Sequence, residues 1–84
     1  RVVSGAVLNP DSEPVVGATV FLTNQKTKAI RSYSSTKMGH FYFAQVNMAE
    51  DYDLWAENGG KKSPVKTVSS WDSRKEFVTD LKLK

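Results

Sequence analysis

The sequence contains no cysteine, which excludes a disulfide-stabilised scaffold and any zinc site built on thiolates. It also lacks a long apolar run. The longest near-continuous one extends from Val15 to Leu22, far short of the roughly 20 residues that span a bilayer. We therefore expect no membrane insertion by this segment.

A concentrated basic tract is absent too. Twelve Lys and Arg residues stand against nine Asp and Glu residues, for a net charge of +3, and they are spread along the whole chain. A nucleic-acid-binding protein usually gathers its basic residues on one face or in one tract. We therefore expect no nucleic-acid partner and interpret the charge as a contribution to solubility.

The chain of 84 residues is long enough for one small domain, residues 1–84. A chain of this size buries only about 60–65% of its unfolded surface, so its core is thin. The first residue is Arg1 rather than methionine, and we expect that a leader, a tag or a neighbouring domain preceded it.

No segment shows a helical period, and short runs of alternating apolar and polar residues recur instead. Turn signals separate these runs, which predicts about seven short strands in an antiparallel β-sandwich. The run over residues 29–36 is polar, and we expect it at a sheet edge. The residues expected to face the core are Val3, Val7, Ala18, Val20, Leu22, Phe41, Phe43, Tyr52, Leu54, Ala56, Phe77, Leu81 and Leu83.

The strongest hairpin signal is the segment Asn58-Gly59-Gly60. Asn58-Gly59 suits the centre of a type I′ turn, which requires positive φ at both positions. Pro64 follows and indicates an edge strand or a bulge. Trp71 lies in a turn, where we expect it to cap the open end of the sandwich.

Three stretches together resemble the carboxypeptidase regulatory-like domain, a transthyretin-like or prealbumin-like sandwich. They are VSGAVLNPDSEPVVGATVFL, STKMGHFYF and YDLWAENGG. The resemblance implies an immunoglobulin-like Greek key in which the third, second, fifth and sixth strands form one sheet. The first, fourth and last strands would form the other.

The resemblance also implies a role. Domains of this family accompany metallocarboxypeptidases, bacterial outer-membrane receptors and adhesins, as folding, spacing or interaction modules without catalysis. An extracytoplasmic and bacterial setting is implied in the same way: periplasmic, secreted or cell-surface.

Candidate catalytic and metal-binding residues are few. His40 is the only histidine, and nothing in the spacing gathers it with Ser35 and Asp51, as a serine–histidine–aspartate set would require. The acidic residues 50, 51 and 53 lack the alternation and the glycine of a calcium loop. We expect no enzyme activity, no metal site and no cofactor.

Two aromatic residues, Phe21 and Trp55, alternate outward from their strands. If the two strands are neighbours, these side chains share the outer face of one sheet, near Thr19, Thr23, Asp53 and Glu57. Such a surface can bind a protein partner, a neighbouring domain or a sugar. The pair can also simply stabilise the sheet across two strands. A plain hairpin would instead set Tyr42 opposite Trp55.

We therefore expect a structural or interaction module with this candidate surface. The alternative is a small carbohydrate- or peptide-binding module that uses the same outward aromatic face.

Overall fold

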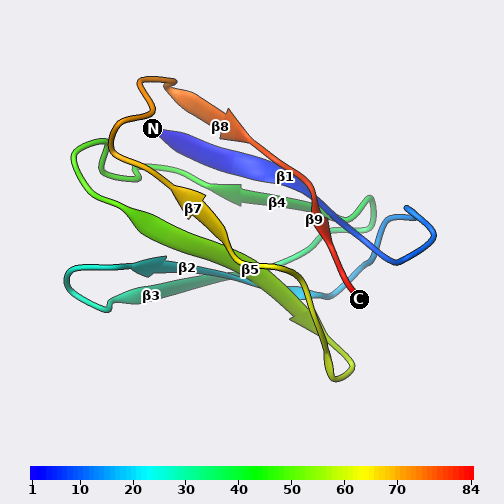
Figure 1. Cartoon of the computed structure of the whole chain (residues 1–84). Coiled ribbons are helices and arrows are strands. Elements are labelled where there is room, and N and C mark those ends of the chain that lie inside the picture. The colour runs from blue at the N-terminus through cyan, green and yellow to red at the C-terminus, as the bar shows by residue number, and fades with distance from the viewer.

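The computed structural model describes residues 1–84 and contains nine strands in two sheets, which lie as two layers in Figure 1. The smaller sheet has the order β4-β1-β8, with β9 also paired to β1. The larger sheet has the order β3-β2-β5-β6, with β7 also paired to β5. The bounds are β1 Val2–Leu8, β2 Thr19–Asn24, β3 Ile30–Ser34, β4 His40–Phe43, β5 Tyr52–Asn58, β6 Lys61–Lys62, β7 Lys66–Val68, β8 Glu76–Val78 and β9 Leu81–Lys82.

The sandwich and the division of strands between its sheets are confirmed. The structure has nine strands because two of the expected strands are each divided in two. The sixth expected strand forms β6 and β7, with a break around Pro64, and the last one forms β8 and β9. Two pairings depart from the antiparallel expectation, since β8 and β9 both run parallel to β1. The chain leaves β7 at the end of the sandwich where β1 begins, so it must then run in the same direction as β1 (Figure 1).

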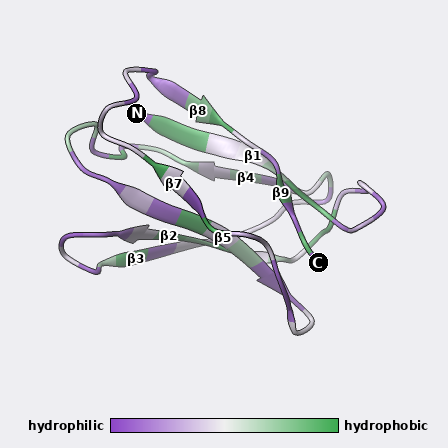
Figure 2. Ribbon diagram, in the orientation of Figure 1, coloured by the Kyte–Doolittle hydropathy of each residue, from purple (hydrophilic) through white to green (hydrophobic).

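The core lies between the sheets and contains 14 buried apolar residues. Hydrophobic and hydrophilic residues alternate along β5 in Figure 2, as a strand with one buried face requires. The inward faces expected from the alternation are confirmed, with Phe41 and Phe43 1% and 2% exposed. Phe77 is only partly buried and packs against the rim of the core. The polar strand β3 lies at the edge of the larger sheet, as expected.

The β5–β6 hairpin turns one residue later than expected. Asn58 pairs with Lys61, so the two central residues are Gly59 and Gly60, with φ of 56° and 80°. The positive φ expected at Gly59 is confirmed, but the placement of Asn58 at the centre of the turn is wrong. Asn58 keeps its place in the ladder because the second glycine adopts the left-handed conformation without steric cost.

Trp71 does not cap the sandwich: its side chain is 94% exposed. The loop that carries it is tied down from both sides. The Arg1 guanidinium donates to the carbonyl oxygens of Ser69 and Asp72, and the Ser70 N–H donates to Asp51 Oδ1 at 2.6 Å. These bonds hold the loop against the N-terminus, so the indole points away from the core.

Candidate interaction surface

The six candidate surface residues lie together on the outer face of the larger sheet. Strands β2 and β5 are antiparallel neighbours, and their register pairs the candidates in three rows. The rows are Thr19 with Glu57, Phe21 with Trp55, and Thr23 with Asp53. Tyr42 instead pairs with Ser4 in the smaller sheet, so the plain hairpin interpretation is wrong.

The aromatic pair forms the middle row. The ring centroids of Phe21 and Trp55 lie 5.2 Å apart with an interplanar angle of 25°, and both residues are half-buried. The Lys62 ammonium lies over the Trp55 ring, 5.3 Å from its centroid. Because β2 and β6 flank β5 on opposite sides, Phe21 and Lys62 cover the indole from opposite sides. The ring edges, rather than the ring faces, are therefore open to a partner.

The polar members of the surface differ in how well their hydrogen-bonding capacity is used. Glu57 Oε2 accepts a hydrogen bond from Trp55 Nε1 at 2.9 Å, and Asp53 Oδ1 accepts one from Gln25 Nε2 at 2.9 Å. The Thr23 hydroxyl is buried and has no hydrogen-bond partner. The carboxylates therefore position their neighbours. None of these hydrogen bonds pairs a nucleophile with a base.

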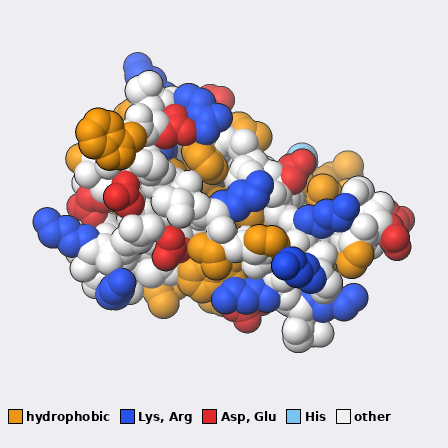
Figure 3. Space-filling view, in the orientation of Figure 1, with side chains coloured by type: hydrophobic (Ala, Val, Ile, Leu, Met, Phe, Trp, Pro, Cys, Tyr) orange, Lys and Arg blue, Asp and Glu red, His pale blue; other side chains and the backbone are white.

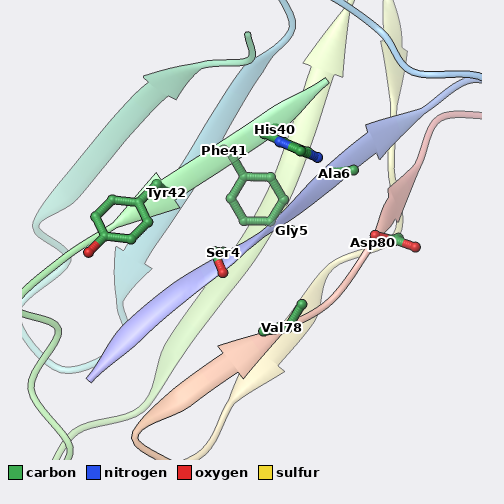
Figure 4. A pocket seen from close by; sticks show the side chains of 8 residues that line it. All are labelled: Ser4, Gly5, Ala6, His40, Phe41, Tyr42, Val78 and Asp80. Atoms are coloured by element: carbon green, nitrogen blue, oxygen red, sulfur yellow. The ribbon is translucent and has the colours of Figure 1, made fainter. Parts of the chain in front are cut away.

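A shallow groove of about 470 Å³ lies on the other side of the molecule, on the smaller sheet (Figure 4). Sequence reasoning missed it, although the glycine within the first strand is a signal for close backbone approach. Ser4, His40 and Asp80 line this groove, together with Gly5, Ala6, Phe41, Tyr42 and Val78.

The polar residues of this groove do not form a catalytic set. His40 pairs with Ala6, while the β1–β9 register places Asp80 beside Ala6 on its other side. The histidine and the carboxylate are thus separated by the width of a strand, and no hydrogen bond joins either of them to Ser4. A serine nucleophile needs direct contact with its base.

The other residues weighed for catalysis have structural partners. The buried Ser35 hydroxyl accepts from the Ala18 N–H at 2.8 Å and donates to the Val15 carbonyl oxygen at 2.7 Å. Asp51 accepts from the backbone and side chain of Ser70, and this hydrogen bonding lowers the pKa of its carboxyl group.

The acidic residues weighed for calcium also have partners of their own. Glu50 bonds to the side-chain amides of Asn24 and Asn47, and Asp53 bonds to Gln25. No group of three or more potential metal ligands is present.

Lys and Arg side chains occur on both sides of the face shown in Figure 3, and several of them lie near one another at its lower right, where few Asp or Glu side chains are visible. No helix long and apolar enough to cross a membrane is present.

The family model described as the carboxypeptidase regulatory-like domain matches residues 2–84. No curated protein matches the chain in sequence.

Solved structures with a similar fold include two dioxygenases. One is the catechol 1,2-dioxygenase from Acinetobacter sp. ADP1 inhibited by bound mercury, with a TM-score of 0.67 and 12% identity over 98% of this chain and 51% of that one. The other is the dioxygenase domain of a dioxygenase carbohydrate-binding protein fusion from Streptomyces sp. SirexAA-E, with a TM-score of 0.66 and 15% identity over 98% of this chain and 77% of that one. The chain spans about half the length of the catechol dioxygenase. At these identities the likeness shows the sandwich fold alone.

Proposed function

The chain belongs to the carboxypeptidase regulatory-like domain family, and we propose that it acts as a non-catalytic, extracytoplasmic accessory module that binds a protein partner or a neighbouring domain. Its contact surface is the outer face of the larger sheet around Phe21 and Trp55. The observation that carries this proposal is the stacked aromatic pair, which is only half-buried in the chain itself.

The composition of the surface supports a protein partner. Aromatic residues are enriched in the cores of interfaces, and a polar rim usually surrounds them. Here Phe21 and Trp55 occupy the middle row, with Thr19, Thr23 and Glu57 in the rows beside them. The pair is held at 5.2 Å before any partner arrives, so little side-chain freedom would be lost on binding.

The carbohydrate alternative receives less support from the same geometry. A sugar ring stacks on an open aromatic face, whereas both faces of the Trp55 indole are covered, by Phe21 and by Lys62. A sugar would have to displace Lys62 from its position over the ring. A protein surface can contact the exposed ring edges without this rearrangement.

Site-specific photo-crosslinking in the producing cell tests the proposal. A benzoylphenylalanine at position 19 should crosslink to a specific protein or to a neighbouring domain, in an extracytoplasmic fraction. The crosslink should disappear when Trp55→Ala is added. The matched control is the same probe at position 78, on the outer face of the smaller sheet, where Val78 is 61% exposed.

Two results would contradict this assignment. Equal crosslinking from position 78, or crosslinking that survives Trp55→Ala, would remove the aromatic pair from the contact. Saturable quenching of tryptophan fluorescence in a glycan screen, lost in Trp55→Ala, would support the carbohydrate alternative instead.

A further inference from the structure

The larger sheet has two unlike edges. One edge is formed by β6 and β7 and is interrupted between them, at Ser63 and Pro64. There the Ala56 N–H donates to the Ser63 hydroxyl at 2.8 Å, instead of to a backbone carbonyl oxygen of the neighbouring strand. Proline and breaks of this kind protect an edge against pairing with another chain. The other edge is β3, a continuous strand that contains neither proline nor glycine.

The backbone of β3 offers unused hydrogen-bonding groups. The Ser35 N–H donates to the Ala18 carbonyl oxygen, and the Asn24 N–H donates to the Ala29 carbonyl oxygen. Because bonded pairs alternate along an antiparallel ladder, the N–H and C=O groups of residues 29, 31, 33 and 35 point toward β2. Those of Ile30, Ser32 and Ser34 point outward, away from the sheet.

The chain segment that carries this edge is basic, and the nearest carboxylates, Glu50 and Asp53, bond to Asn24 and Gln25 in the turn before β3. Between Glu13 and Glu50 the sequence contains no acidic residue and four basic ones: Lys26, Lys28, Arg31 and Lys37. Arg31 lies on β3 itself, with its guanidinium carbon 5.5 Å from the centroid of the Phe43 ring. The one ion pair of the structure, Arg74–Asp72, lies in the loop before β8, so Arg31 has no carboxylate partner.

We propose that β3 is a strand-addition site that accepts an acidic, extended segment of a partner protein. The outward groups of Ile30, Ser32 and Ser34 supply the ladder hydrogen bonds of an added strand. Arg31 selects for carboxylates in that strand, since an unpaired guanidinium beside the new strand favours an acidic neighbour. A second copy of this chain fits less well, because two β3 edges would bring like charges together. This site is separate from the aromatic surface of β2 and β5.

The direct test uses the isolated protein and a synthetic peptide. The probe is a short, acetylated and amidated peptide in which glutamate alternates with threonine, and the control peptide carries lysine in place of glutamate. We expect saturable shifts of the Ile30, Ser32 and Ser34 amide signals in ¹H–¹⁵N spectra with the acidic peptide only. Added salt should weaken this binding because exposed charges are screened.

Two variants separate the backbone and charge contributions. Ser32→Pro removes an N–H that is not used within the domain, and it should weaken binding by about tenfold while the unfolding midpoint changes little. Arg31→Glu should abolish binding of the acidic peptide and create binding of the lysine peptide. The charge-matched control is Lys61→Glu on the opposite edge, which should leave the affinity within about twofold.

Three outcomes would overturn the proposal. They are an absence of shifts at millimolar peptide, shifts confined to β6 and β7, and equal binding of both peptides. An oligonucleotide that produces the same shifts as the acidic peptide would overturn it too, because the site would then recognise charge without strand pairing. If Ser32→Pro fails to fold, the wild-type shifts and the charge reversal by Arg31→Glu still decide the matter.

Discussion

The two sheets of the sandwich are built differently at their centres. In the smaller sheet, the middle of β1 is Gly5, and a Cβ placed there would lie 1.7 Å from the Thr79 carbonyl oxygen. In the larger sheet, the middle of the outer face is filled by the stacked rings of Phe21 and Trp55. One centre therefore depends on the absence of a side chain and the other on the presence of two. The smaller sheet should tolerate substitution at its centre far less well.

The largest expected effect concerns the core that both sheets share. Phe41 projects inward from β4 and is 1% exposed. Phe41→Ala should lower the free energy of unfolding by about 3–5 kcal/mol, most of the stability of so small a domain. Denaturant unfolding measures the change, with outward-facing Tyr42→Ala as the control. A loss below about 1 kcal/mol would show that Phe41 is not a core residue.

Gly5→Ala tests the centre of the smaller sheet. The new methyl group would meet backbone rather than a flexible side chain, and the φ of 155° is unfavourable for alanine. We expect a loss of about 2–4 kcal/mol of unfolding free energy, from overpacking and backbone strain together. The control is Gly17→Ala, where φ is 74° and no neighbouring atom lies within 4 Å of the added Cβ. Only the backbone strain of a positive φ, about 1 kcal/mol, should remain there. Equal losses in the two variants would argue against the close approach of Thr79.

The edges of the larger sheet depend on two buried serines. Ser35 and Ser63 each accept a hydrogen bond from a backbone N–H, of Ala18 and Ala56, at 2.8 Å. Ser35→Ala and Ser63→Ala should each cost about 1–3 kcal/mol, because each leaves a buried N–H without a partner. The exposed Ser34→Ala serves as the control in the same unfolding experiment. A cost near zero would mean that water replaces the hydroxyl.

A smaller effect is expected at the centre of the larger sheet. A double-mutant cycle of Phe21→Ala and Trp55→Ala should give a coupling energy of about 0.5–1.5 kcal/mol, the range for stacked aromatic pairs. A coupling near zero would show that the rings pack independently. Because each ring is half-buried, the domain should stay folded in both single variants, which makes them usable in the crosslinking experiment.

The smallest effect concerns the loop that leads into β8 of the smaller sheet. Hydrogen bonds from the Arg74 side chain lower the pKa of Asp72 from 3.8 to about 2. A depressed carboxyl pKa stabilises the folded state above the unfolded value, and this contribution is lost as the pH falls from 3.8 toward 2. Asp72→Asn should therefore reduce the acid sensitivity of the urea midpoint in this range. The same change at exposed Asp11 is the control.

Most of the larger sheet could be predicted from sequence alone. The alternation along β2 and β5 places Phe21 and Trp55 outward, and the segment Asn58-Gly59-Gly60 predicts the hairpin. The observed turn lies one residue later than Asn58-Gly59 predicts, because Asn and Gly both adopt positive φ. Either Asn58-Gly59 or Gly59-Gly60 can form the centre of the turn, and the pairing of Asn58 with Lys61 selects Gly59-Gly60.

The smaller sheet and the loops were less predictable. The sequence predicts that Trp71 caps the sandwich, but the hydrogen bonds that hold its loop, from Arg1 to Ser69 and from Ser70 to Asp51, join residues far apart in the chain. The groove above Gly5 and the parallel course of β8 depend on contacts of the same kind.

Alternation and turn residues by themselves therefore determined that this chain is a β-sandwich and which face of each strand is buried, because both follow from local backbone geometry and the period of two. The family resemblance supplied the order of the strands. Only the tertiary structure decided that Thr79 approaches Gly5, that Lys62 lies over Trp55, and that β8 and β9 run parallel to β1. These features depend on which distant segments lie side by side, and no local pattern encodes that choice.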